Sequence, residues 1–567
     1  MNASNTCCTR KWNTLARIFL IAVPLLTFGV VVNFDFVRWD DDINILNNPH
    51  VASLGFAEVA WMFTDVEWAH RYLPLGWMTY AVERSLWGAD PFMFHLGNLA
   101  WHIVNGLLLF GIVKRILHLA GGGNGEPGPG VIAPAALAAL LWMINPLRAE
   151  VVSWSSARIY LMATFWFFLA VTFYLDTSDS ATRRRRWAIL FYALSLLTYP
   201  VAMLAGPVFI LLDWLVLNRL PRRVMEWSQA SYRGVWIEKL PFVGLSVAWL
   251  MLMVLTRNQG RDVGYVDTLQ VFDIPHRLAQ GLWGLVYYLT KPWWPTNLAP
   301  QYGNLYQFEV GEGRFLAAVV IVVGITAFCV TRKRPVYLAL WGAHLLFFVP
   351  FIGLTEYPHS FYDRYSYAAG GLMAVLVGMA LWKAWPQSTA RWGSTVAAVA
   401  AVGVFMVMSS RQTLIWQNTA TVRLRVAESL GHPELRAQHE QVAGQYFMDQ
   451  KDPAQALECY EQAWTHDPAD VDYRLDMGDA LVALEREEEA LAIFREVAAL
   501  PAVEIRPRLH LGVSLCKLGR LEEGAAAFQK ILEENPDHEK ARHNLDLALE
   551  HIRKSKPALE PVSFPQP

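Results

Sequence analysis

Charged residues are scarce in this sequence, since Asp, Glu, Lys and Arg together make up only 17% of its 567 residues. Soluble globular domains carry about 25% charged residues, so the composition excludes an ordinary soluble enzyme. Apolar residues make up 54% of the chain, which excludes an intrinsically disordered protein. Roughly half of the charged residues lie beyond residue 410. The sequence therefore predicts a long part in a lipid bilayer, followed by a part in water.

Cysteine is rare as well, and neither sign of charge is in large excess. The five cysteines, Cys7, Cys8, Cys329, Cys459 and Cys516, show neither disulfide nor metal-ligand spacing. Buried or incidental thiols are therefore expected. A net charge of −2 at pH 7 argues against a nucleic-acid partner. The pattern requires no cofactor, and it is compatible with a divalent metal without implying one.

Long apolar runs fill the first 410 residues. A spanning helix needs about 20 mostly apolar residues, and about eleven such runs occur. The first, residues 18–32, follows three basic residues and has no small-residue cleavage site after it, so we expect an uncleaved anchor. The other runs lie near residues 95–113, 131–147, 158–175, 187–200, 201–217, 238–256, 314–331, 335–353, 366–383 and 393–410.

Arginine-rich loops set the expected orientation. The positive-inside rule places these loops in the cytoplasm together with the N-terminus. The assignments agree with one another only if a helix near residues 275–290 does not cross, so we expect it to be interfacial or re-entrant within an outer loop over 257–313. An odd number of spans then places the C-terminal part on the outer face of the membrane. The basic runs are Arg183 to Arg186, Arg219 with Arg222 and Arg223, and Arg332 to Arg334.

A repeat with a period of 34 residues begins beyond residue 434. Such a period, with a small residue, an aromatic and a closing proline, is the tetratricopeptide signature. Each unit is a helical hairpin, and stacked hairpins form a solenoid that docks proteins or peptides. A structural or oligomerising cap with no ligand is the alternative. The repeated positions are Gly444, Gly478 and Gly512, then Tyr460, Phe494 and Phe528, with Pro468 and Pro536 two periods apart.

The chain is therefore expected to be all-α, with a polytopic membrane bundle ahead of an α-solenoid. We place the membrane part at residues 1–410 and a linker helix at 411–433. The repeat part follows at 434–556, with about three repeats and a final helix, and a disordered tail covers 557–567.

Ionisable side chains next to a bilayer are costly, which makes them candidates for function. The most concentrated cluster is Trp39-Asp40-Asp41-Asp42, just outside the first span. One carboxylate there would act as a general base while a neighbour binds a hydroxyl, a sugar or a metal. The alternative is a helix cap or a solvated loop.

Three further groups lie at outer ends of the predicted spans. Glu150 and Arg158 either face one cavity or form a plain surface pair. Arg364 either binds a phosphate bidentately or pairs with its neighbour Asp363. Lys291 suits a phosphate or headgroup, although lysines at this depth often snorkel. Because all the groups fall on one face, they suit transfer of a group from a phosphate-bearing lipid to a nucleophile from outside.

Several of these residues lie in ordered motifs that resemble those of the transmembrane and tetratricopeptide-repeat O-mannosyltransferases and their bacterial relatives. Together with the repeats, the resemblance covers nearly the whole chain. The matching segments are Phe36-Val37-Arg38-Trp39-Asp40-Asp41-Asp42, Asn47-Asn48-Pro49-His50-Val51, Tyr72-Leu73-Pro74-Leu75, Asp90-Pro91-Phe92 with His95, Asn98, His102 and Asn105, the set Pro146, Glu150, Trp154 and Arg158, Trp294 to Pro300, and Asp363 to Tyr367.

The resemblance implies a glycosyltransferase of the C-type fold that uses a polyprenyl-phosphate sugar, mannose or a similar hexose. The sugar would pass to a protein hydroxyl with inversion, while the repeats hold the acceptor. Asp40 and Asp41 carry over as the paired acids and Glu150 as the acid of the second loop. The implied donor phosphate or sugar contacts are Arg158, Lys291, Arg364, Asp363 and His102.

The chain departs from the family pattern at four positions. Where relatives commonly have His-Pro-x-His, this chain has Asn145 and Arg148. An acid two places after the family arginine is Tyr160 here, and a lysine before proline in a later span is Tyr199. These changes leave the acids intact, and they bear on the identity of the donor.

Two other functions compete with the glycosyltransferase. A non-catalytic membrane scaffold would use the repeats to assemble envelope or pilus proteins, and the four altered positions favour it slightly. A transporter or lipid-linked glycan flippase would place charges at mid-membrane, whereas the acids here cluster at one face.

The orientation can be tested with a reporter enzyme that is active only outside the cytoplasm. Fused after Pro567, it should be active, because an odd number of spans exports the repeats. The same reporter fused after Arg186 should be silent. If a reporter that is active only in the cytoplasm were active after Pro567, the prediction that the candidate residues share the outer face would be wrong.

Overall fold

The computed structural model describes the chain except residues 1–2, 69–70, 124, 260–273, 303–307, 333–334, 354–360, 500–504 and 556–567. The predicted tail at 557–567 therefore lies outside the described residues, as do two of the three basic residues at 332–334. The described residues are helical and contain no strand, as the sequence predicts. They divide into two compact units, Met1–Val422 and Arg423–Pro567.

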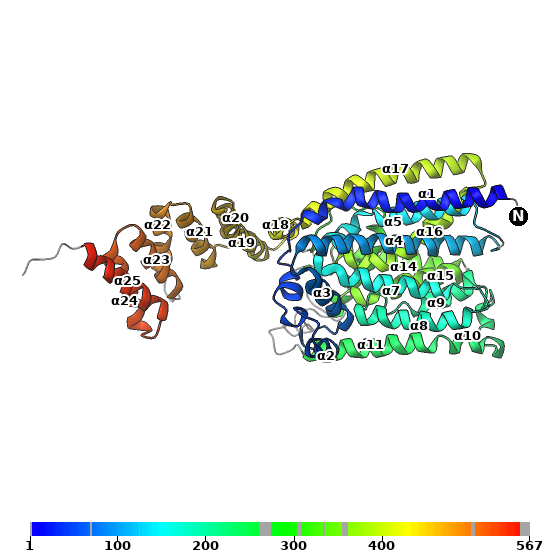
Figure 1. Cartoon of the computed structure of the whole chain (residues 1–567), viewed down its shortest axis with the longest axis horizontal. Coiled ribbons are helices and arrows are strands. Elements are labelled where there is room, and N and C mark those ends of the chain that lie inside the picture. Colours follow the sequence, from blue (N-terminus) through cyan, green and yellow to red (C-terminus); the bar gives the residue numbers. More distant parts are fainter. Residues whose placement is uncertain are drawn as a thin grey trace, which may run out of the picture. The chain divides into compact units, whose positions relative to one another are not determined.

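Most of the first unit is helical, and every predicted apolar run overlaps one of its helices. Figure 1 shows many of them running side by side. The helices are α1 (Ala3–Phe28), α4 (Pro91–Ala120), α5 (Pro129–Met143), α7 (Arg158–Tyr174), α8 (Ala181–Thr198), α9 (Gly206–Leu211), α11 (Leu240–Gln259), α13 (Ile274–Thr290), α14 (Gly313–Thr331), α15 (Pro335–Phe348), α16 (Ser366–Ala384) and α17 (Ser388–Thr413).

Length and composition identify the helices suited to a membrane. Within the described residues, six helices are long and apolar enough to cross, or up to eight if each of two bent pairs is one span. Two shorter apolar helices, Gly206–Val216 and Pro335–Phe351, add to these. α8 is the remaining predicted span, and four consecutive arginines near its start lower its hydropathy. The result is roughly consistent with the predicted eleven and confirms a multi-pass membrane bundle.

The helix expected near residues 275–290 is present as α13, and it is amphipathic. One face is buried and includes Gln280, Gly284 and Tyr288, while Ile274 and Leu278 are exposed. A Cβ at Gly284 would lie 2.5 Å from the Phe361 ring, so glycine permits close packing there. Whether α13 crosses the bilayer stays a prediction.

Small residues set the packing of α4, α5 and α16. A Cβ at Gly378 of α16 would lie 2.7 Å from Val113 of α4. A Cβ at Gly370 would lie 2.9 Å from the Trp142 indole of α5. Without side chains at such positions, membrane helices approach closely and gain van der Waals contact.

The arginines that set the expected orientation also tie helices together. Arg219 lies 2.8 Å from both Asp213 and Glu238, and Arg185 lies 3.5 Å from Glu238. Lys239 pairs with the fully buried Asp213. This network joins α8, the turn after α9 and the start of α11.

The helices α2 (Phe56–Thr64) and α3 (Pro74–Trp87) lie at the end of the bundle away from the N-terminus (Figure 1). The chain leaves α1 through a 3-10 turn (Gly29–Asn33) and then forms α2 and α3. Two more pieces, α6 (Ala149–Ser153) and a 3-10 turn η13 (Asp363–Tyr365), pack against each other. The loops that carry the predicted site residues therefore meet within one unit.

The second unit consists of helical hairpins followed by a final helix, α25 (Glu539–Ser555). At each repeated glycine, a Cβ would overlap the ring of the repeated aromatic: Gly444 with Tyr460, Gly478 with Phe494 and Gly512 with Phe528. The hairpins are α19 (Pro433–Asp449) with α20 (Pro453–His466), α21 (Val471–Ala483) with α22 (Glu487–Ala498), and α23 (Ile505–Lys517) with α24 (Leu521–Glu534). The ring thus fills the space that the glycine leaves. Between the two units, α18 (Thr419–Ser429) spans the division.

This packing predicts the effect of one methyl group. Gly478→Ala should destabilise its hairpin by about 1–3 kcal/mol, because overpacking forces the Phe494 ring to shift. Hydrogen exchange of the full chain should show faster exchange in α21 and α22. Gly431→Ala is the control, since a Cβ there meets nothing within 4 Å. Equal protection in both variants would show that the contact is unimportant.

Candidate functional site

Asp40 and Arg71 form a partly exposed pair of opposite charge. Their side chains are 25% and 38% exposed, and Arg71 Nη2 lies 3.6 Å from Asp40 Oδ2. Asp40 follows α1, and Arg71 lies just ahead of α3. The loop before Asp40 is held in place, because Arg38 N donates to Thr419 Oγ1 at 3.0 Å. A reachable carboxylate therefore stands beside a reachable cation.

Arg71 also faces three tyrosines. Burial acts to lower the pKa of its guanidinium, but Asp40 and then Tyr199, Tyr160 and Tyr365 outweigh it and raise the pKa. Tyr160 lies on α7, Tyr199 caps α8 and Tyr365 belongs to η13. Four separate segments thus contribute to the surroundings of one cation.

Asp41 is buried, and its carboxylate bonds Ser156 instead of Arg71. Its Oδ1 accepts hydrogen bonds from Ser156 N at 2.8 Å and Ser156 Oγ at 2.5 Å, and its Oδ2 accepts from Val37 N at 3.0 Å. Burial raises its pKa from 3.8 to about 7, although these hydrogen bonds oppose the shift. Asp41 therefore joins the loop after α1 to the turn that begins α7.

Glu150 and Arg364 form a buried ion pair that organises η13. Glu150 Oε2 accepts from Arg364 N at 2.8 Å, and Oε1 pairs with Arg364 Nη1. Arg364 Nε donates to Tyr160 Oη at 3.1 Å. The guanidinium also lies 3.6 Å from the centre of the Tyr362 ring. Both charges are satisfied within the protein, and the pair fixes the backbone beside Tyr365.

Asp363 points to α13 and the loop after it. Its Oδ1 accepts from Tyr287 Oη at 2.5 Å and from Tyr302 Oη at 3.2 Å. Lys291 donates to the carbonyl of Thr296 at 2.5 Å. Burial lowers the pKa of Lys291, and the Asp363 carboxylate opposes this effect. The predicted lysine therefore lies within the electrostatic reach of Asp363.

Arg158 and His102 are core residues. Arg158 bonds Asn98 Oδ1 at 2.5 Å and the Phe94 carbonyl at 2.6 Å, and it pairs with Glu83. His102 Nδ1 lies 2.8 Å from Tyr367 Oη, and its Nε2 lies 3.0 Å from the Met143 carbonyl. Both side chains are at most 2% exposed, so their polar atoms bond protein and hold helices together.

The structure thus places Glu150 against Arg364 and Asp41 against Ser156 ahead of α7, and leaves His102 in the core. Sequence reasoning missed Arg71, Ser156 and Glu83. Arg71 immediately precedes the Tyr72-Leu73-Pro74 motif, and that adjacency was the available signal. Nothing in the sequence marked Ser156 or Glu83, because their partners are more than 70 residues away.

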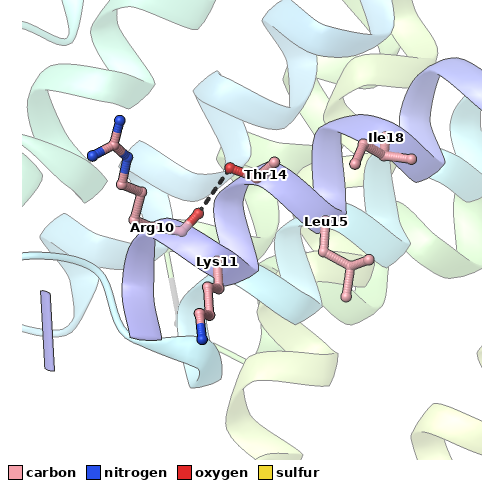
Figure 2. A pocket seen from close by; sticks show the side chains of 5 residues that line it. All are labelled: Arg10, Lys11, Thr14, Leu15 and Ile18. Carbon is pink, nitrogen blue, oxygen red and sulfur yellow. Dashed lines mark hydrogen bonds between the residues drawn. The ribbon is translucent and has the colours of Figure 1, made fainter. Parts of the chain in front are cut away.

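A depression on α1 lies apart from these residues. Figure 2 shows a shallow depression lined by Arg10, Lys11, Thr14, Leu15 and Ile18. All five belong to α1 and none is acidic, so the depression lacks the groups for the predicted chemistry. Within the described ranges, no group of three or more His, Cys, Asp or Glu could hold a metal ion.

Comparison with known proteins finds related sequences. Tetratricopeptide-repeat families match residues 447–501 and 508–538. Over 175 residues, the chain is 28% identical to Protein O-mannosyl-transferase TMTC1 of Homo sapiens, which covers 29% of this chain and 18% of that protein. The chain thus matches less than a fifth of that relative's length. These similarities confirm the resemblance to the transmembrane and tetratricopeptide-repeat O-mannosyltransferases over the residues they cover.

Two solved structures of ArnT from Cupriavidus metallidurans, one bound to undecaprenyl phosphate and one in the apo state, also align. Each has a TM-score of 0.33 and 15% identity, covering 86% of this chain and 81% of that chain. This TM-score is too low to assign a shared fold.

The raised pKa of Asp41 predicts a pH dependence of stability. Between its ordinary value of 3.8 and about 7, the folded chain holds this proton more tightly than the unfolded chain does. Stability should therefore fall as pH rises through this window and level off above it. Asp41→Asn should reduce that slope in melting curves of the detergent-solubilised protein, leaving the part that comes from Asp363, whose pKa burial also raises to about 7. Asp42→Asn, in the same loop, should keep the full slope; an Asp41→Asn slope as steep as that of the wild type would contradict the assignment.

Proposed function

We propose that this chain is a membrane glycosyltransferase of the C-type fold. It would move mannose or a similar hexose from a polyprenyl-phosphate donor to a protein hydroxyl, on the outer face of a bacterial inner membrane. The observation that carries the proposal is the pair of Asp40 and Arg71, 3.6 Å apart and both partly exposed. The named relative, an O-mannosyl-transferase, supports the reaction class.

Asp40 is the base in this proposal. Its carboxylate takes the proton from the acceptor hydroxyl as the acceptor oxygen bonds to the anomeric carbon. The bond from that carbon to the phosphate oxygen breaks in the same displacement, so the configuration inverts. Asp41 cannot replace it directly, because both of its oxygens accept hydrogen bonds from protein groups. Asp41 instead positions the loop that carries Asp40.

Arg71 stabilises the leaving phosphate. Negative charge grows on the phosphate as the bond breaks, and a fixed cation there lowers the barrier. Arg364 does not contact the phosphate in this proposal, because its guanidinium already bonds Glu150 and Tyr160. Lys291 supplies a further positive charge on the α13 side. No step requires a metal, and divalent-metal dependence is open to direct measurement.

The repeats hold the acceptor protein and raise its concentration at the site. Two tetratricopeptide matches support this role for residues 447–538. The glycine and aromatic pairs that pack each hairpin keep the solenoid rigid. A rigid surface loses less entropy when it binds an extended segment.

Glycan mass spectrometry of envelope proteins tests the reaction. Cells that lack the chain should lose a hexose modification, and the wild-type chain should restore it. Asp40→Asn should lower transfer by about 10²-fold or more because the proton has no acceptor. Arg71→Gln should lower it by a similar factor. Asp42→Asn is the matched control and should restore the modification fully.

Protein levels and melting temperatures of the variants keep loss of activity apart from loss of folding. If hexose transfer persists in a stable Asp40→Asn chain, Asp40 is not the base. If no modification depends on the chain at all, the scaffold function replaces the enzyme.

A further inference from the structure

The loop that carries Asp40 rests on the segment that begins α18. The backbone N–H of Asp35 donates to the carbonyl oxygen of Gln417, and the N–H of Arg38 donates to Thr419 Oγ1, both at 3.0 Å. Arg38 and Thr419 are 381 residues apart in the sequence. Just ahead of the proposed base, the backbone is therefore bonded to a side chain from the far end of the first unit.

The supporting segment is itself firmly packed. Trp416 is 1% exposed, and its ring stacks on that of Trp154 with centres 5.7 Å apart and planes 24° apart. Thr419 is buried as well. Trp154 lies close in the chain to Ser156, which bonds Asp41. One packed group of residues thus holds the loop on both sides of the proposed base.

The backbone around Asp40 is bonded, while its side chain is reachable. The Arg38 amide is held by Thr419, and the carbonyl oxygen of Asp40 accepts from the N–H of Asn44 at 2.8 Å. The Asp40 side chain is 25% exposed. The Thr419 hydroxyl therefore helps to set the backbone from which the carboxylate extends.

The same hydroxyl belongs to the helix that leads toward the repeats. α18 begins at Thr419 and continues past Val422, where the first unit ends. Asn418 Oδ1 accepts from the N–H of Thr421 at 3.0 Å, and Thr421 Oγ1 donates to the Asn418 carbonyl at 2.9 Å. The side chains of Asn418 and Thr421 thus close the first turn of α18, and the Thr419 oxygen accepts from the loop.

We infer that Thr419 is a positioning residue for Asp40. This inference rests on the proposed function, because that function makes Asp40 the base. A base must lie within hydrogen-bond reach of the hydroxyl that it deprotonates, and a displacement of about 1 Å can cost about 10²-fold in rate. The bond from Arg38 to Thr419 restricts that displacement. Thr419 acts through the loop, so its loss should slow transfer without weakening the donor.

Steady-state transfer by membranes that contain the full chain tests this role. The donor is undecaprenyl phosphate mannose, and the acceptors are envelope proteins from cells that lack the chain, whose sites are unmodified. Thr419→Val keeps the shape of the side chain and leaves the Arg38 N–H without its acceptor. It should lower kcat about tenfold and leave the KM for the donor unchanged. Thr419→Ser keeps the hydroxyl and should recover most of the lost rate.

A double variant distinguishes positioning from a separate structural effect. Asp40→Asn combined with Thr419→Val should be no slower than Asp40→Asn alone, because the position of the loop is unimportant once the base is gone. Thr172→Val is the matched control, since the Thr172 hydroxyl bonds the Phe168 carbonyl within α7. It should transfer as the wild type does.

Hydrogen exchange over residues 35–38 measures the support of the loop without any activity. Exchange there should be about fivefold faster in Thr419→Val, because one hydrogen bond is lost, and unchanged in Thr172→Val. Melting temperatures identify the variants that remain folded. Thr419→Ala removes the same acceptor and replaces the valine variant if that chain does not fold.

The outcomes separate this inference from the function on which it rests. If the wild type transfers no hexose, the proposed function fails and the inference fails with it. If Asp40→Asn slows transfer but a folded Thr419→Val chain does not, Thr419 does not position the base and the proposed function stands. If the double variant is about tenfold slower than Asp40→Asn, Thr419 acts on something other than Asp40, and the positioning role is wrong.

Discussion

Desolvation of charge governs the membrane part of this protein. A charge buried without a partner costs far more than a surface charge, so buried ions are paired or hydrogen-bonded. Arg158 meets this requirement with Glu83 and Asn98, and Arg364 meets it with Glu150. Each pairing joins segments far apart in the chain, and together they fix the loops at one end of the bundle. Asp40 and Arg71 remain partly exposed within that frame.

The charged residues of the site therefore divide into those that build it and those that a ligand can reach. Asp41 bonds Ser156 and the backbone of Val37, which holds the loop after α1 against the turn that begins α7. Within the described residues, the side chain of its neighbour Asp40 makes no such hydrogen bond, and it pairs with Arg71. Adjacent residues of one type thus have different chemistry, because one points into the protein and the other toward its surface. The mechanism proposed above depends on this division.

Much of the architecture could be predicted from periodicity alone. The 34-residue spacing of Gly444, Gly478 and Gly512 identified the hairpins, because a glycine facing an aromatic ring is a local requirement of each unit. The apolar runs located the membrane helices because this requirement is local too. A spanning helix makes all of its backbone hydrogen bonds within its own segment. The roles of Asp41, Glu150 and Arg158 could not be read this way, because their partners Ser156, Arg364 and Asn98 lie 60 or more residues distant.

The sequence by itself determined the two environments, the helices, the repeats and the set of candidate charged residues, because these follow from composition and local spacing. Only the tertiary structure decided which of those residues are buried and which are reachable. It also placed Tyr160 against Tyr199 and Arg71 beside Asp40. These contacts arise from the packing of α3, α7, α8 and η13, whose residues come from distant parts of the chain. Whether each charged side chain is buried or exposed depends on these contacts between segments, and no single segment specifies it.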